Sequence, residues 1–158
     1  MELKNIRSLI EVESLIKEAM KEKQADILSV LRLIKAKVVF EEKNDGQPLS
    51  EEAFIGVLAD LIKEHRDSIE KYSKAKRSDL VEAEENELKI LTELTPGASF
   101  SEDDLITCAK EEIERVKVEN GSISMKDMRP IMDRVKEKFK FADGKLISNI
   151  VKENILNS

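Results

Sequence analysis

The chain of 158 residues is poor in residues that make turns or bind metals, with one cysteine, one histidine, three prolines and five glycines. A strand-rich fold needs many turns, so this scarcity favours long helices with few connections. The single cysteine, Cys108, cannot form an internal disulfide, and we therefore expect a reducing compartment, most simply the cytoplasm. One histidine and one cysteine also exclude the usual His/Cys zinc site. The glycines stand too far apart for a phosphate-binding loop.

Long apolar runs are also missing. No stretch approaches the ~20 apolar residues needed to cross a bilayer. The N-terminus mixes charged and apolar residues and lacks the apolar segment of a secretory signal. We therefore expect no contact with a membrane. The chain is nevertheless 41% hydrophobic, which is enough for a modest core and argues against disorder throughout.

Apolar residues recur at helical spacing along nearly the whole chain, and this pattern predicts an all-α fold. Four helices are expected first, at about residues 3–23, 26–43, 51–74 and 79–94. The stop signal in Thr95-Pro96-Gly97-Ala98-Ser99 then predicts a domain boundary. Three shorter helices follow it. The expected organisation is thus a four-helix N-terminal domain, 1–95, and a small three-helix domain, 96–158.

Several residues have the character of helix caps. Ser50 and Ser101 precede acidic first turns, and Ser124 with Asp127 has the spacing of a capping box. Asp79 and Glu82 have the same spacing, and Asp26 is expected as a cap or first-turn acid. Pro130 lies too deep for a helix that starts after Ser124, so it either kinks that helix or delays its start.

Charge is unevenly distributed. Residues 1–95 carry a net charge of −5, residues 96–119 carry −4 and residues 120–158 carry +3. One side of a helix is expected to carry Arg129, Lys136 and Lys140, and a neighbouring row carries Arg134 and Lys138. Lys145 lies at the start of the last helix, where backbone N–H groups can bind an anion. This basic segment is either a solvated surface or a contact for a polyanion.

Candidate catalytic or metal-binding residues have structural explanations. His65 is expected at the edge of a packed stripe, and acidic neighbours should raise the pKa of Cys108 rather than lower it. The acidic run is expected to be a solvated helix face; it comprises Glu82, Glu84, Glu85 and Glu87. The methionines at 125, 128 and 132 are expected in the core, although a groove for a partner helix is the alternative. We therefore expect no catalytic residue, metal or cofactor.

Three segments together resemble a known family. They are Leu31-Arg32-Leu33-Ile34-Lys35-Ala36; Lys63-Glu64-His65-Arg66-Asp67-Ser68-Ile69-Glu70 with Glu84-Glu85-Asn86-Glu87-Leu88; and Ser124-Met125-Lys126-Asp127-Met128 with Ala142-Asp143-Gly144-Lys145-Leu146. The chain resembles the YqeY-like proteins of the GatB/YqeY family over nearly its whole length. The resemblance implies an all-helical protein whose C-terminal part is similar to the tail domain of GatB, a subunit of the tRNA-dependent amidotransferase. That tail contacts tRNA and performs no chemistry.

The resemblance leaves three functions to compare. The first is a non-catalytic, monomeric tRNA-interacting protein linked to amidation of Glu-tRNA(Gln) or Asp-tRNA(Asn), with amidotransferase or synthetase components as further partners. Its tRNA-binding candidates are Lys136, Lys138, Lys140, Lys145, Arg129 and Arg134. The second is intrinsic carbon–nitrogen ligase activity with glutamine as amide donor, a term that such proteins tend to receive, although the chain shows no nucleophile or ATP site. The third is a protein–protein adaptor that docks a partner through its C-terminal domain.

Overall fold

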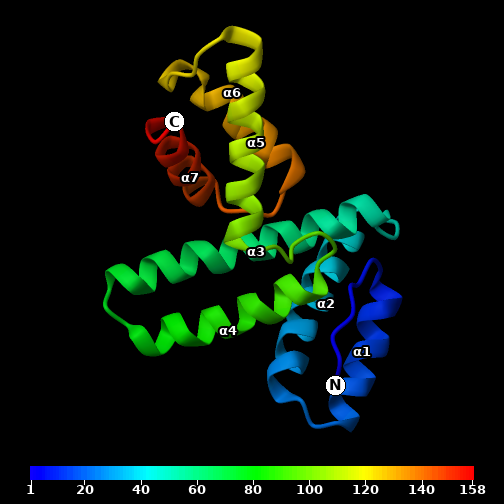
Figure 1. Ribbon diagram of the computed structural model, residues 1–158. Coiled ribbons are helices and arrows are strands. Elements are labelled where there is room, and N and C mark those ends of the chain that lie inside the picture. The colour runs from blue at the N-terminus through cyan, green and yellow to red at the C-terminus, as the bar shows by residue number, and fades with distance from the viewer. The chain divides into compact units, whose positions relative to one another are not determined.

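The protein is entirely helical, as the hydrophobic periodicity predicts. The computed structural model describes residues 1–158, which form seven α-helices and one short 3-10 helix, without strands (Figure 1). Contacts divide the chain into two compact units, Met1–Pro96 and Gly97–Ser158. That each unit is an independently folding domain stays a prediction. None of the helices combines the length and the apolar character that crossing a membrane requires.

Two helical hairpins make up the first unit. The helices are α1 (Leu9–Lys21), α2 (Ala25–Asp45), α3 (Glu51–Lys74) and α4 (Ser78–Leu94). Helix α1 packs mainly on α2, and α3 packs along α4, while α2 also contacts both α3 and α4 (Figure 1). Fully buried side chains from all four helices, such as Val12, Leu31, Phe54 and Leu91, form the core. The predicted helical stripes therefore face one another.

The first helix begins later than the periodicity predicts. Ser8 caps α1 by accepting a hydrogen bond from the Glu11 backbone N–H, so the helix starts at Leu9 rather than Leu3. The preceding residues are not helical, yet Ile6 is only 1% exposed. Its backbone N–H donates to the Leu94 carbonyl at 2.9 Å, at the end of α4. Ile6 thus follows the apolar pattern because it joins the core, not because it belongs to a helix.

The predicted capping box at Asp79 and Glu82 is wrong. Helix α4 starts at Ser78, and its N-cap residue, Arg77, makes no side-chain capping bond. Asp79 instead accepts hydrogen bonds from the Arg77 guanidinium at 3.2 and 3.1 Å. This hydrogen bonding lowers the pKa of the Asp79 carboxyl below its ordinary value. Asp26 lies in the first turn of α2, which confirms the first-turn alternative predicted for it, because Gln24 is the N-cap residue.

Three mutually packed helices form the second unit. They are α5 (Glu102–Asn120), α6 (Met128–Lys138) and α7 (Gly144–Leu156), with the 3-10 helix η1 (Met125–Asp127) before α6. The predicted caps Ser101 and Ser124 both take part in capping boxes. The capping box at Ser124 lies at the start of η1, and α6 begins only at Met128. Pro130 therefore lies in the first turn of α6. Pro130 therefore delays the helix and does not kink it.

Candidate nucleic-acid interface

A buried carboxylate lies under the basic surface of the second unit. Glu112 is only 1% exposed and belongs to the inward stripe of α5, beside Ala109, Ile113 and Val116. A carboxylate is retained at such a position only when it is paired. Its partners come from two helices and are all cationic.

Glu112 accepts hydrogen bonds from Arg134 and Lys138 and forms an ion pair with Arg115. Arg134 Nη1 lies 3.5 Å from Glu112 Oε2, and Lys138 Nζ lies 3.4 Å from Oε1. Arg134 and Lys138 are one turn apart on α6, and Arg115, on α5 itself, completes the set with Nη1 at 3.6 Å from Oε2. We call these four residues the Glu112 cluster. The side chains of the three cations are 41 to 56% exposed, so the cluster presents an excess of positive charge to solvent.

The other predicted cations surround this cluster in different ways. Arg129 and Lys136 lie exposed on α6 and take part in no ion pair. Lys140 is also exposed, but α6 ends at Lys138, so Lys140 lies in the following turn and does not continue the predicted helical row. Helix α6 carries four basic and two acidic side chains. The cationic surface is thus centred on α6 and its C-terminal turn.

The start of α7 is less open to anions than the sequence suggests. Lys145 lies in its first turn, as predicted, and its side chain is exposed. Its backbone N–H, however, donates to the carboxylate of Asp143, the N-cap residue, at 3.1 Å. A phosphate would have to compete with this carboxylate for the same donor. We therefore expect an anion contact here to use the Lys145 side chain rather than this backbone N–H.

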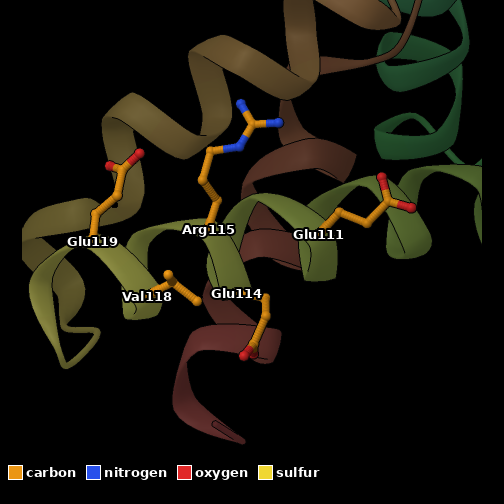
Figure 2. Close-up of a pocket in the computed structure, with 5 residues that line it drawn as sticks. All are labelled: Glu111, Glu114, Arg115, Val118 and Glu119. Carbon is orange, nitrogen blue, oxygen red and sulfur yellow. The ribbon is translucent and has the colours of Figure 1, made fainter.

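The outer face of α5 limits the cationic surface on one side. A surface pocket of 400 Å³ on this helix is lined by Glu111, Glu114, Arg115, Val118 and Glu119. Figure 2 shows Arg115 on the same side of α5 as Glu111 and Glu119, with Val118 and Glu114 on the other side. Three carboxylates beside one guanidinium repel phosphate. Arg115 therefore marks the edge of the basic surface rather than its centre.

Aromatic and methionine side chains near the cluster belong mainly to the core. The Phe139 and Phe100 rings meet edge to face with centroids 5.3 Å apart, and both pack against the hydrophobic core of the second unit. Met128 and Met132 pack on the same core, whereas Met125 is 43% exposed. Packed rings are poor platforms for stacking bases. The surface therefore suits contact with phosphates better than contact with bases.

The candidate nucleophile has no thiolate character. Cys108 is buried on α5, one turn before Glu112. Burial raises the pKa of its thiol above the ordinary value; the charge of Lys138 opposes this shift, and the negative charges of Glu112 and Glu111 add to it. The direction of the shift confirms the prediction, but its main cause is burial and not the acidic neighbours, and the thiol stays protonated at neutral pH.

In the first unit, the structure brings together residues that the sequence analysis treats separately. His65 is 6% exposed on α3, as expected for a packed position. Its Nε2 lies 3.0 Å from Glu87 Oε2 and 3.7 Å from Glu84 Oε2, both on α4. These two acids are therefore not part of a solvated face. The sequence does contain a signal for this contact. His65 and Glu87 are the same number of residues from Lys76, in the turn between α3 and α4, so they lie opposite each other in the helical hairpin.

Comparison with known proteins places the whole chain in one group. Residues 10–155 match the family model of the Yqey-like protein. The chain is similar to the altered inheritance of mitochondria protein 41, mitochondrial, of Pyrenophora tritici-repentis, with 29% identity over 87% of this chain and 75% of that protein. It is also similar to an uncharacterized protein of Schizosaccharomyces pombe, with 28% identity over 58% of this chain and 73% of that protein. Since the family model covers nearly every helix, the chain belongs to the family of YqeY-like proteins.

Proposed function

We propose that the protein binds tRNA through the basic surface of its second unit and performs no chemistry on it. The surface comprises Arg129, Arg134, Lys136, Lys138, Lys140 and Lys145. The observation that carries the proposal is the Glu112 cluster, in which one buried carboxylate holds cations whose outer atoms remain in solvent. Phosphate contacts need cations and exposed donors at fixed positions, and α6 supplies both.

The buried carboxylate makes these cations better ligands for a polyanion. A free lysine or arginine side chain loses rotamer entropy when it is fixed against a phosphate. Arg134 and Lys138 are already oriented by Glu112, so part of that cost is met in the unbound protein. Arg134 and Lys138 outweigh the single charge of Glu112, and this positive excess attracts the backbone of a nucleic acid. The acidic outer face of α5 confines the contact to the α6 side.

The sequence resemblance implies that the second unit is similar to the GatB tail domain, and this expectation favours tRNA among the possible nucleic acids. It also suggests a setting in tRNA-dependent amidation, together with amidotransferase or synthetase components. Catalysis itself would need a glutaminase nucleophile and a site for ATP. Cys108 is buried with a raised pKa, and His65 is engaged by two glutamates. We therefore propose an accessory role and not an amidotransferase activity.

Binding of bulk tRNA to a filter, measured over a range of salt concentrations, tests the proposal. The variant Lys136→Gln/Lys138→Gln/Lys140→Gln should bind more weakly. Its salt dependence should be flatter by up to about three units, because each lost phosphate contact removes about one released counterion. The control is Lys17→Gln/Lys21→Gln/Lys23→Gln, which changes the same charge at three exposed positions of the first unit.

The outcome separates the competing functions. Weaker binding by the α6 variant alone supports the proposal. Equal binding by the two triple variants, or no binding by the wild type, would remove it and bring the adaptor hypothesis forward. Glutamine turnover by the isolated protein, lost in a Cys108→Ala or His65→Gln variant, would instead support an amidotransferase.

A further inference from the structure

The contact between α3 and α4 contains a cluster of three metal-ligating side chains that the proposed function does not use. His65, Glu84 and Glu87 each offer one ligand atom, and these atoms lie within 4.8 Å of one another. The two glutamates are three residues apart on α4 and so share a face of that helix. The imidazole is 7% exposed and is aimed at both carboxylates, which are 25 and 38% exposed.

A backbone carbonyl outside this cluster determines which imidazole nitrogen of His65 carries a proton. His65 Nδ1 lies 2.8 Å from the backbone carbonyl oxygen of Leu61, one turn earlier on α3. A carbonyl oxygen only accepts hydrogen bonds, so Nδ1 carries the proton and donates. In the neutral imidazole Nε2 then carries a lone pair. That lone pair has no donor among its neighbours, because it faces the Glu87 carboxylate at 3.0 Å and the Glu84 carboxylate at 3.7 Å.

Three acceptors that converge in this way can be bridged either by a proton on Nε2 or by a metal ion. A proton on Nε2 would form one short hydrogen bond to Glu87 and leave Glu84 at a longer distance. The imidazolium and the two carboxylates together would then keep a net negative charge in a partly buried position. A divalent metal would engage all three atoms and cancel the two carboxylate charges. Metal-binding histidines characteristically donate their second ring N–H to a backbone carbonyl or carboxylate, as His65 does to Leu61.

The separations also suit a first-row metal. Bonds of about 2.0 Å from Zn²⁺ to nitrogen and oxygen place neighbouring ligand atoms of a tetrahedron about 3.3 Å apart. The two measured separations from Nε2, 3.0 and 3.7 Å, lie on either side of that value. Both carboxylates are partly exposed, so water can reach a free coordination position from solvent.

We propose that His65, Glu84 and Glu87 form a binding site for a divalent transition metal of the Zn²⁺ class. His65 binds through Nε2, and each glutamate binds through one carboxylate oxygen. Water completes the coordination, since the protein supplies three ligands and both carboxylates reach solvent. The metal links α3 to α4 within the first unit, and the site is independent of tRNA binding by the second unit.

Calorimetric titration of untagged, metal-free protein with Zn²⁺ tests this site. The wild type should bind one equivalent and unfold at a higher temperature when Zn²⁺ is present. Loss of a partner outside the coordination shell commonly weakens metal binding 10- to 100-fold, so Glu84→Gln/Glu87→Gln, which removes two direct ligands, should weaken it ~100-fold or more. The matched control, Glu82→Gln/Glu85→Gln, removes the same charge from exposed positions of the same helix and should bind like the wild type.

Nitrogen NMR of the imidazole gives a readout that does not depend on any variant. His65 is the only histidine, so its ring signals need no assignment by mutation. Zn²⁺ should shift Nε2 strongly while Nδ1 keeps its proton. The proposal is overturned if no stoichiometric binding occurs, if both double variants bind Zn²⁺ equally, or if both ring nitrogens stay protonated at saturating Zn²⁺.

Discussion

Arg134 on α6 donates from Nη1 to Oε2 of Glu112 on α5 across 3.5 Å, and so joins an exposed guanidinium to a carboxylate that is 1% exposed. Burial of an ionised carboxylate is costly unless charges and hydrogen bonds compensate it. Lys138 and Arg115 provide that compensation together with Arg134. The same contacts that make burial of Glu112 possible therefore also fix the cations of the proposed tRNA-binding surface.

The Glu112→Gln variant should lower the free energy of unfolding by about 1–2 kcal/mol, because a carboxamide cannot compensate three cations. The loss is smaller than for a fully buried ion pair, since the cations keep access to water. Urea denaturation of the variant and the wild type measures this loss in the free energy of unfolding. Glu114→Gln, an exposed change two residues further along α5 and without an ion pair, should stay within about 0.5 kcal/mol of the wild type. Equal effects of the two changes would show that the Glu112 cluster does not stabilise the fold.

The helices themselves follow from the sequence, because apolar side chains at helical spacing determine which face must be buried. The helix starts are less well predicted. Ile6 continues the apolar pattern of α1 but enters the core from a segment that is not helical. Asp79 has the spacing of a cap, but its carboxylate binds Arg77, a competing local donor. In both cases a contact outside the helical pattern decides the structure.

The Glu112 cluster was not predicted because Glu112 is one of many acids in α5. Its position gives a usable signal, since it lies on the same stripe as Leu105, Ala109 and Val116. Which cations meet it depends on the packing of α6 against α5, and no local pattern determines that packing. The contact of His65 with Glu87 could have been found by counting from the turn, but the separation from Glu84 depends on side-chain rotamers.

Lys76 gives a test of the turn that aligns α3 with α4. It adopts a φ of +56°, a left-handed conformation that favours glycine. Lys76→Gly should therefore raise the free energy of unfolding by about 0.5–1 kcal/mol. Lys71→Gly, an exposed helical position on α3, should lower it by about 1 kcal/mol. Thermal unfolding distinguishes the two signs, and a destabilising Lys76→Gly would argue against strain at this turn.

Ile6 tests whether the non-helical N-terminal segment stabilises the first unit. Its side chain is 1% exposed, so Ile6→Ala should cost about 2–4 kcal/mol through lost burial and a new cavity. Ile10 is 79% exposed on α1 and gives the control, since Ile10→Ala should change stability by no more than about 0.5 kcal/mol. Chemical denaturation of the two variants is the measurement. Similar stability of both would mean that the segment is frayed in solution.

The second unit should fold without the first. Its buried cluster is built only from residues between Leu105 and Ile155, together with partly buried side chains such as Phe100. A fragment of residues 97–158 should therefore show helical circular dichroism and a cooperative urea transition. A fragment of residues 1–96 is the companion measurement. A helical but non-cooperative 97–158 fragment would contradict the two-domain organisation, because the core would then need support from the rest of the chain.

Cys108 predicts a dependence of stability on alkaline pH. Because burial raises the pKa of its thiol in the folded protein, the folded state disfavours the thiolate. The stabilisation is fully present below the pKa of the unfolded thiol, about 8.5, and is lost as pH rises through the higher folded value. The free energy of unfolding should thus fall more steeply above about pH 8.5 in the wild type than in Cys108→Ala. Parallel curves for the two proteins would contradict a raised pKa, and so would rapid reaction of the native thiol with an aromatic disulfide reagent at pH 8.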